Sequence, residues 1–496
     1  MFEKNKKAKN TKYVIGGFVA LAAIIVMFVL FKFPQPGVAN QGDFYRVMGP
    51  AGIAYTDAYI NNPNLQKFFY YTITDYKMVF SGNVIVSTIL GSSVGYLIAL
   101  IKIICKAFNQ DIFKTQYLAF VYAVIYIFAF AVILKNLRIK NIIKLSILSL
   151  LVLFVFFDGN YLVWFNSFYG EPMMIVTLML ISAAVLYYIN VRYDDENNKK
   201  LFKAIAFVII ACFLFMGSKL QVTTALPFIL MFVLKILIDN RKKVSKKKFI
   251  ILIIMFIVMA VYPINISRDS KGLNRDTQFN SVFYGILNTS DTPKQDLIDL
   301  GLNPDMSGEA GKHAYLPDDK YEKYIPRTEL TEKEFYSKIS NFKLAKFYLT
   351  HPKRLFQAME YTASKAYMTS TSLGKYTEQY SKTPVEKLNR FVYWSEFREN
   401  KLPRNLLFIS FVFIAVFLVS LYSYKAGDKV IKNRVMLLWL IMMIAVMQFP
   451  MPFVGNGKAD VVKQLYLFNF IFDILMFVSV LWVIFKLIDV IKNIKR

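Results

Sequence analysis

The sequence has few of the residues on which disulfide, zinc and thiol chemistry depend. Among 496 residues there are only two cysteines, Cys105 and Cys212, and two histidines, His313 and His351. Both cysteines lie in apolar segments, and the histidines are too far apart for the short spacing of a zinc-binding pair, so neither a disulfide framework nor a histidine zinc site is expected. The phosphate-binding loop, the dinucleotide glycine fingerprint and the serine elbow are also missing. We therefore expect no ATP-driven, nicotinamide-dependent or serine-hydrolase chemistry.

Acidic residues are scarce as well. The chain has 33 of them against 60 lysines and arginines, which gives a net charge of +27. A nucleic-acid partner is nevertheless not predicted, because the positive charge gathers in short links between apolar segments. Residues 268–404, the longest polar stretch, have 22 basic and 18 acidic residues and are nearly balanced. Such clusters follow the positive-inside rule and report orientation in a membrane. The basic links are 135–140, 192–200, 241–248, 425–434 and 492–496.

What the chain does contain is apolar sequence in helix-length runs. It is 56% hydrophobic, and about 20 apolar residues in a helix span a bilayer. The candidate spans are 14–33, 84–105, 116–134, 141–157, 172–190, 201–217, 219–238, 249–267, 405–424, 434–450 and 465–489. The sequence therefore predicts an all-α membrane protein with ten or eleven transmembrane helices. The first run is longer than the apolar core of a signal peptide, so we interpret it as an uncleaved span.

The basic links place both termini in the cytoplasm and the loops 34–83 and 158–171 outside. Between the first of these loops and the internal link 135–140 lie two apolar segments, 84–105 and 116–134, where an odd number of crossings is required. Small residues at 91–95 could bend the first segment into a re-entrant hairpin or could allow close helix packing. Both alternatives are left open.

Three parts follow from this topology. Residues 1–267 would form an N-terminal transmembrane catalytic bundle, 268–404 a mainly helical extracytoplasmic domain and 405–496 the C-terminal transmembrane helices. Within the middle part, a capping-box pattern at residues 331–334 predicts a helix through about Leu349. A second helix is predicted from Lys353 to about Ser370, since His351-Pro352 ends the first.

The strongest candidate site follows the first span directly. Asp43 lies three residues before Arg46, with the polar residues Asn40 and Gln41 just before them. An ionised aspartate can accept a proton from an acceptor hydroxyl as a general base. The guanidinium fork of Arg46 matches a phosphate oxygen pair. We assign Asp43 as catalytic, Arg46 as phosphate-binding, and Asn40 and Gln41 as substrate-binding.

The second external loop supplies the other candidate acids. Asp158 and Glu171 stand at the two ends of the loop and are assigned catalytic roles, since an acid at the end of a span is costly unless paired or wet. Asn166 and Tyr169, which lie between them, are assigned to substrate binding. For Glu171, a helix dipole alone would also favour a carboxylate before Pro172.

Polar residues at two other span ends complete the assignment. Lys219 and Arg268 are predicted to bind the donor phosphate, and Gln221 to bind substrate. No cofactor is predicted outright. A divalent cation held by the three acids Asp43, Asp158 and Glu171 stays open, because oxygen ligands suit hard cations.

Several stretches in a shared order resemble one family of membrane enzymes. They are Asn40-Gln41-Gly42-Asp43-Phe44-Tyr45-Arg46, Asp158 with 165–172, 280–287, 300–302 and 348–352. In these the chain resembles the GT-C class of polytopic glycosyltransferases, and more narrowly the WsfD-like hexose transferases of bacterial surface-glycan biosynthesis. The resemblance implies a GT-C-like bundle and transfer of a hexose from a polyprenyl phosphate to a cell-surface glycan on the outer face of a bacterial plasma membrane.

The same resemblance implies roles for two acids. Asp43 would be the first-loop acid near the acceptor, and Asp158 the second-loop acid near the lipid phosphate or a metal. Many members of the class have a pair of acids in the first loop, whereas Asp43 stands between Gly42 and Phe44. This departure leaves the metal requirement open.

Outward-facing acids also favour a lipid-linked donor on physical grounds, because nucleotide sugars are cytoplasmic and their diphosphate does not cross hydrocarbon unaided. Three alternatives compete with this prediction, and one of them is a purely structural membrane scaffold, which would tolerate any substitution of Asp43. A flippase or transporter of lipid-linked glycans would need interrupted helices with charges at mid-membrane. A glycan polymerase or ligase would need a groove wide enough for an oligosaccharide.

Overall fold

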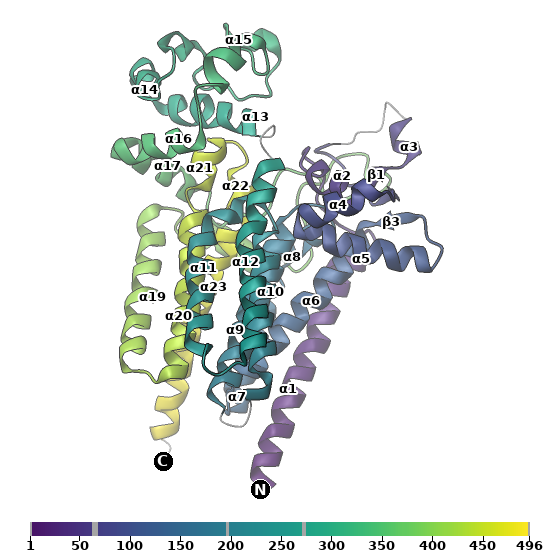
Figure 1. The fold of residues 1–496 in the computed structure, drawn as a ribbon, viewed down its shortest axis with the longest axis vertical. Helices are drawn as coiled ribbons and strands as arrows, with labels where there is room; N and C mark the ends of the chain where they lie inside the picture. Colours follow the sequence, from purple (N-terminus) through teal and green to yellow (C-terminus); the bar gives the residue numbers. More distant parts are fainter. Residues whose placement is uncertain (1, 62–67, 195–197, 270–273, 495–496) are drawn as a thin grey trace.

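The computed structural model describes residues 2–61, 68–194, 198–269 and 274–494. Most of these residues are helical, and long helices run side by side in a bundle (Figure 1). A helical lobe of residues 274–364 and a smaller lobe built around α2–α5 stand at one end of the bundle, while both chain termini lie at the other. The prediction of an all-α membrane protein is confirmed. Both termini lie at the same end of the bundle, as two cytoplasmic termini require. That this end is cytoplasmic stays a prediction.

The bundle is built from α1 (Phe2–Val26), α6 (Thr115–Asn136), α7 (Ile142–Phe156), α9 (Glu171–Tyr193), α10 (Asn198–Met216), α11 (Leu226–Asn240), α12 (Lys246–Asp269), α19 (Leu406–Ala426), α20 (Lys429–Gln448) and α23 (Tyr466–Ile494). In the described part of the chain, eight helices are long and apolar enough to span a bilayer, or nine if α7 and the bent turn after it count as one. The prediction of ten or eleven exceeds this number for two reasons. Lysines at 199, 200 and 203 shorten the apolar run of α10, and segment 84–105 is split into two shorter helices.

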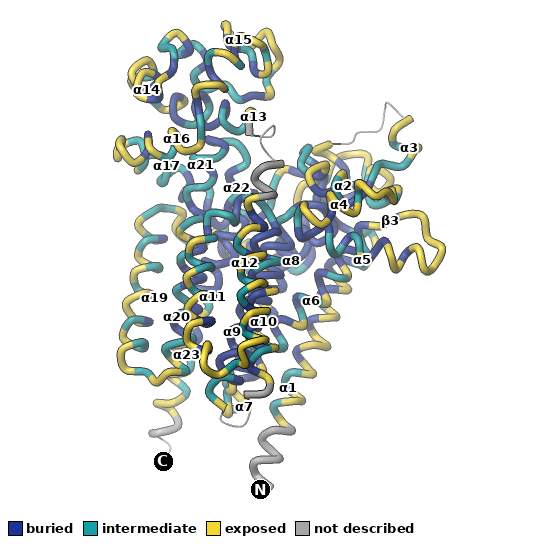
Figure 2. Tube along the Cα trace, viewed as in Figure 1, coloured by how far each residue is buried: buried dark blue, intermediate teal, exposed yellow. Residues whose placement is uncertain are grey.

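Helix α9 forms the centre of the bundle. Its most apolar stretch is 94% buried, and it packs against α6, α10 and α20, where Figure 2 shows the darkest part of the molecule. A helix that is apolar on every side is stable only when other helices surround it. The outer helices instead expose large apolar side chains, such as Leu407 and Phe411 on α19, as contact with lipid tails requires.

Segment 84–105 does not cross the bundle. The strands β1 (Ile53–Tyr55), β2 (Asp75–Met78) and β3 (Ile112–Lys114) form one antiparallel sheet in the order β1-β2-β3. The helices α4 (Gly82–Leu90) and α5 (Ser93–Ala107) lie between β2 and β3, so the chain leaves this sheet and returns to it. The bend falls at Gly91 and Ser92, whose hydroxyl caps α5. The segment is therefore bent at its small residues, as the hairpin alternative requires, while its position relative to the bilayer stays a prediction. The small sheet was not predicted, because its strands are only three or four residues long.

A buried lysine holds this smaller lobe together. The Lys102 ammonium on α5 donates hydrogen bonds to the carbonyl oxygens of Ala51 (2.9 Å), Gly52 (3.1 Å) and Val79 (2.6 Å). We expect Lys102→Met to lower the free energy of unfolding by about 2–3 kcal/mol, since hydrogen bonds from charged groups are among the stronger ones. Thermal unfolding of the purified chain in detergent measures the change. Lys106→Met, which removes an exposed lysine of the same helix, should leave the unfolding temperature nearly unchanged. Equal stability of the two variants would contradict the prediction.

The lobe of residues 274–364 has a hydrophobic core of its own. Its helices include α13 (Asn274–Phe279), α14 (Pro293–Asp299), α16 (Asn341–Thr350) and α17 (Pro352–Ser364). Phe453 of α21 (Met451–Asn456) joins this core and anchors the lobe to the bundle. The side chains of Ala366, Tyr367 and Leu388, further along the predicted domain, pack into the core of the bundle instead. The predicted domain therefore contributes to two cores.

The first predicted helix of this lobe starts later than expected. After the short α15 (Glu329–Thr331) and a turn of π-helix, α16 begins at Asn341, where the Ser340 hydroxyl accepts the N–H of Lys343. Ser340 therefore caps the helix in place of the pattern at 331–334. The second helix, α17, ends at Ser364 and not near Ser370.

Candidate functional site

The loop after the first helix presents Asp43 at the end of the bundle that bears the two lobes. The side-chain oxygen of Asn40 accepts the N–H groups of Gly42 (2.8 Å) and Phe44 (3.2 Å). Its amide donates to the Tyr55 hydroxyl at 3.0 Å. Gly42 has φ +108°, a conformation that a residue with a side chain rarely adopts. Asn40 thus shapes the turn that carries Asp43.

Asp43 lies between two cations. Its Oδ2 is 2.6 Å from Lys463 Nζ, and its Oδ1 is 3.3 Å from Arg46 Nη2. Lys463 is 5% exposed and Arg46 is 43% exposed. One cation is therefore nearly buried beside Asp43, while the other is partly exposed.

Charge pairing outweighs burial at this site. Burial alone would raise the pKa of the Asp43 carboxyl, but Lys463 and Arg46 together hold that pKa well below its ordinary value. Burial would lower the pKa of Lys463, but Asp43 and then Asp460 raise it above the usual lysine range. Both groups are therefore charged at neutral pH.

The link 451–464 brings Lys463 to Asp43 from the far end of the sequence. Lys463 lies on the short α22 (Val461–Gln464), which follows Asp460. The side-chain amide of Gln41 bridges the two, since its Nε2 donates to Asp460 and its Oε1 accepts from Lys463 at 3.2 Å. Asp460 has φ +55°, a conformation with a cost that persists only where surrounding contacts enforce it. Our sequence reasoning missed Lys463; a lone lysine in a short polar link is a weak signal.

Tyr169 packs against the cluster formed by Gln41, Asp43 and Lys463. Its hydroxyl accepts the N–H of Gln41 at 2.8 Å and donates to the Ala39 carbonyl at 2.9 Å. Its ring lies 5.4 Å from Lys463 Nζ, within cation–π range. Tyr169 therefore joins the first and second predicted loops at the site.

Glu171 and Lys219 form a second ion pair beside the first. Glu171 Oε1 lies 2.6 Å from Lys219 Nζ at the start of α9. The other oxygen of this fully buried carboxylate, Oε2, has no hydrogen-bond partner among the described residues. A Cβ on Gly170 would lie 2.5 Å from the Ser218 carbonyl, so only glycine allows this close approach. Lys219 also helps to lower the pKa of Asp43, which places both pairs in one electrostatic cluster.

Two further predicted residues are buried beside the site and bond to the backbone of the segments that form it. Asn166 donates from Nδ2 to the carbonyls of Pro36 (2.7 Å) and Leu30 (3.3 Å). Gln221 donates from Nε2 to the Gln464 carbonyl at 2.7 Å. Both side chains are buried, and their bonds position the loop of Asp43 and the helix of Lys463.

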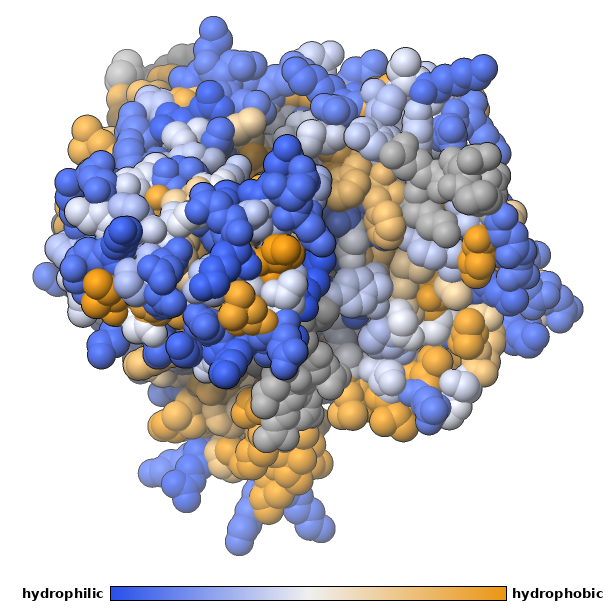
Figure 3. Space-filling model, turned by 90° about the horizontal axis from the view of Figure 1, so that it is seen from above, coloured by the Kyte–Doolittle hydropathy of each residue, from blue (hydrophilic) through white to orange (hydrophobic). Residues whose placement is uncertain are grey.

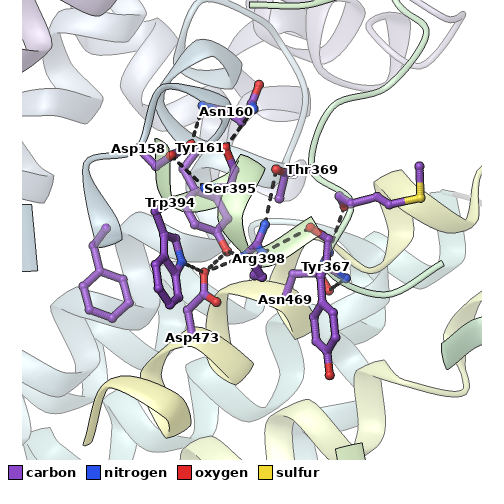
Figure 4. Close-up of polar contacts among 12 residues, drawn as sticks. Asp158, Asn160, Tyr161, Tyr367, Thr369, Trp394, Ser395, Arg398, Asn469 and Asp473 are labelled. Carbon is purple, nitrogen blue, oxygen red and sulfur yellow. Dashed lines mark hydrogen bonds and ion pairs between the residues drawn. The ribbon is translucent and has the colours of Figure 1, made fainter. Parts of the chain in front are cut away.

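Asp158 belongs to a different cluster (Figure 4). It is fully buried and caps α8 (Gly159–Leu162). One carboxylate oxygen accepts the N–H of Asn160 at 2.9 Å, and the other accepts the N–H of Ser395 at 3.0 Å. The structure therefore does not bring Asp158 together with Asp43 and Glu171. Both of its oxygens already hold backbone in place.

Figure 4 also shows a buried ion pair that the sequence did not reveal to us. Arg398 of α18 (Tyr393–Lys401) pairs with Asp473 of α23, and both side chains are 0% exposed. The Tyr161 hydroxyl and Trp394 Nε1 donate to the same oxygen of Asp473 at 2.7 and 2.9 Å. An acid inside an apolar segment is costly unless paired, and this was the signal that could have found it.

The remaining predictions concern Arg268 and the metal. The side chain of Arg268 lies outside the described residues. In the part of the chain that the structure describes, no three His, Cys, Asp or Glu side chains are grouped to hold a metal ion. The cation site left open for Asp43, Asp158 and Glu171 is therefore not formed among these residues, because Asp158 lies in the other cluster.

Comparison with known proteins identifies the family. The model of the YfdI N-terminal transmembrane domain matches residues 3–496, so the chain belongs to this family. It is a multi-pass membrane protein. A comparison with curated proteins finds no match.

Two solved structures show a distant likeness. One is the archaeal oligosaccharyltransferase AglB from Archaeoglobus fulgidus in complex with an inhibitory peptide and a dolichol-phosphate, at 14% identity and a TM-score of 0.37. The other is the Archaeoglobus fulgidus oligosaccharyltransferase in the apo form, at 12% identity and a TM-score of 0.39. Each comparison covers 97% of this chain and 52% of the other, so the chain spans about half the length of those proteins.

Proposed function

We propose that this member of the YfdI N-terminal transmembrane domain family is a membrane glycosyltransferase. It would move a hexose from a polyprenyl-phosphate donor to a cell-surface glycan on the extracytoplasmic face of a bacterial plasma membrane, as GT-C enzymes of the WsfD-like type do. The observation that carries the proposal is the carboxylate of Asp43 held between the cations Lys463 and Arg46 at one end of a membrane bundle.

The donor has a charged phosphate and an apolar polyprenyl chain, and the protein has a suitable surface for each. Its phosphate would bind Arg46 and Lys463, with Lys219 nearby, because charge-assisted hydrogen bonds to phosphate are strong. Figure 3 shows a hollow between the lobe of residues 274–364 and the lobe of α2–α5, with hydrophobic surface on its wall. The polyprenyl chain would leave the hollow toward the lipid.

Transfer is a single displacement. The acceptor hydroxyl oxygen attacks C1 of the hexose, the bond from C1 to the phosphate oxygen breaks, and the polyprenyl phosphate leaves with the electron pair. Asp43 takes the hydroxyl proton as general base, and the two cations stabilise the leaving phosphate. At rest the cations make Asp43 a weak base. A bound phosphate would share them, raise the pKa of Asp43 and so activate the base only when the donor is present.

The other predicted residues take supporting roles. Glu171 holds Lys219 in place, Tyr169 and Gln41 position Lys463, and Asp158, assigned above as catalytic, positions the backbone at Ser395. These are positioning roles, since each of these side chains holds another protein group through at least one polar contact, in the case of Glu171 through Oε1.

The test is a transfer assay on the full chain in lipid vesicles. Polyprenyl phosphates bearing individual labelled hexoses are supplied together with a bacterial surface glycan. Labelled glycan and free polyprenyl phosphate in equal amounts support the proposal. Movement of intact donor between the leaflets without bond cleavage would replace it with the flippase alternative.

Lys463→Met should raise the donor KM about tenfold to hundredfold, the effect of losing one hydrogen bond from a charged group to phosphate. It should also raise the pKa of Asp43, because Lys463 is the main cause that lowers it. The ionised form of Asp43 is the base, so activity at falling pH should be lost at a higher pH than in the wild type. Profiles of kcat/KM against pH measure both effects. Lys458→Met, in the same link, is the control, and an unshifted acidic limb in Lys463→Met would contradict the prediction.

A further inference from the structure

The lobe of residues 274–364 contains an open pocket of about 200 Å³ that the proposed chemistry does not use. Its lining includes Tyr315, Leu316, Asp318, Tyr321 and Arg327. This volume is below the roughly 300–1,000 Å³ of sites for drug-sized ligands. The pocket therefore suits a small ring more than an extended molecule.

The walls of the pocket are held in place by contacts of their own. The Tyr321 hydroxyl donates to the His313 carbonyl at 2.7 Å and accepts the N–H of Leu316 at 3.1 Å. The Arg327 guanidinium forms two hydrogen bonds with the carboxylate of Asp276, at 3.1 and 2.7 Å. A site whose groups are fixed before binding loses less entropy when a ligand arrives.

An exposed aromatic ring and a strained residue meet here. Tyr315 is 63% exposed, and the guanidinium carbon of Arg327 lies 5.5 Å from the centre of its ring. Arg327 has φ +68°, which costs of the order of 1–3 kcal/mol and is typical of ligand-binding positions. The pocket thus has two independent signs of a binding role, its stacked ring and its strained backbone.

A chain of contacts connects this pocket to the turn of Lys463. The N–H of Ala314 donates to Asn280 Oδ1 at 2.8 Å, and Asn280 Nδ2 donates to Asn456 Oδ1 at 2.9 Å. A Cβ on Gly457 would lie 2.2 Å from the Asn280 carbonyl, so the two segments are in tight contact. These contacts hold the pocket at a fixed position relative to the link 451–464, which carries Lys463.

The charges of the two sites also affect one another. Burial and Asp276 raise the pKa of the Tyr315 hydroxyl to about 12, and Asp43 adds to this rise. Tyr315 in turn contributes to the raised pKa of Arg46. Charges act on each other in this way only over short separations, so the Tyr315 hydroxyl lies in the neighbourhood of Asp43 and Arg46.

The charge of the pocket decides between classes of ligand. Arg327 is neutralised by Asp276, and Asp318 adds a negative charge to the lining. An anion such as the donor phosphate is therefore disfavoured, whereas a neutral polyhydroxyl ring finds donors, acceptors and an aromatic face. We infer that this pocket binds a sugar ring of the acceptor glycan and presents its neighbouring hydroxyl to Asp43. The inference rests on the proposed function and adds the place of the acceptor to it.

The test uses the full chain in detergent and methyl glycosides of the common hexoses as probes. Saturation-transfer NMR without donor reports binding to the chain itself. Tyr315→Ala should weaken the affinity obtained from titration of the signal about tenfold, equivalent to about 1.4 kcal/mol. Tyr393→Ala, which removes another exposed tyrosine, should leave it unchanged. In the transfer assay, Tyr315→Ala should raise the acceptor KM about tenfold and leave the donor KM as it is.

Four outcomes decide the matter. Loss of the glycoside signal in Tyr315→Ala supports the pocket even where no wild-type transfer is found, in which case the proposed function alone fails. An equal signal from Tyr315→Ala and wild type overturns the pocket, as does the absence of any signal from wild type. Displacement of the glycosides by inorganic phosphate also overturns it, because the site would then bind anions.

Discussion

Asp43→Asn is expected to lower kcat for hexose transfer by about 10²- to 10⁴-fold, the usual contribution of a general base. The amide has nearly the same shape and still offers an oxygen to Lys463, but it cannot take the acceptor proton. The rate of release of polyprenyl phosphate under saturating donor and acceptor measures the effect.

The donor KM separates this role from a structural one. Removing the carboxylate leaves the nearly buried Lys463 without its closest anion, so the donor phosphate should bind as well as before or better. We therefore expect a loss of kcat with a donor KM that does not rise. A merely structural role would raise both KM values and lower the yield of folded protein.

Asp57→Asn is the matched control for this variant. Asp57 lies in the same loop, is largely exposed and is 3.5 Å from Lys77, a pairing that contributes little in water. Its replacement should leave turnover within a factor of two of wild type. Near-normal turnover in Asp43→Asn would remove Asp43 from the role of base, and the proposed displacement would need another proton acceptor.

Local sequence patterns predicted the membrane class and most spans, because each span depends only on its own run of apolar residues. They failed where tertiary contacts decide. Segment 84–105 has enough apolar residues to cross, but Gly91 and Ser92 break it, and Lys102 needs carbonyls that only the loop before it supplies. The start of α16 at Asn341 was missed because two capping patterns compete within ten residues of sequence.

The site was predicted in part for the same reason. Asp43 and Arg46 are three residues apart, so their pairing is local and can be predicted from the sequence. Lys463 pairs with Asp43 although more than 400 residues separate them in the sequence. No pattern in the link around Lys463 predicts that pairing. For Asp158 the pattern identified a buried acid but not its partners, since the N–H groups it accepts come partly from Ser395, on another element.

The contact between α18 and α23 provides the largest expected effect on stability. Arg398→Met should lower the free energy of unfolding by about 3–5 kcal/mol, because it leaves the carboxylate of Asp473 buried without its cation. Asp473→Leu should cost a similar amount, since it leaves a fully buried guanidinium and deprives Tyr161 and Trp394 of their acceptor. Loss of thermal stability in detergent and reduced yield of folded protein measure both.

The double variant Arg398→Met/Asp473→Leu tests whether the pair acts as a unit. Apolar side chains of similar size can replace a buried ion pair at little cost. The donors of Tyr161 and Trp394 would then lack their acceptor, and the Tyr367 carbonyl and the Thr369 hydroxyl would lack the guanidinium that donates to them, at about 1–3 kcal/mol each. These partners are lost in the single variants as well, whereas the unpaired buried charge is not present in the double variant. The double variant should therefore be clearly more stable than the sum of the single losses predicts. Lys401→Met, an exposed position at the end of α18, is the control and should change little. Strictly additive losses would mean that the two residues stabilise the fold separately and not as a pair, which would contradict the prediction.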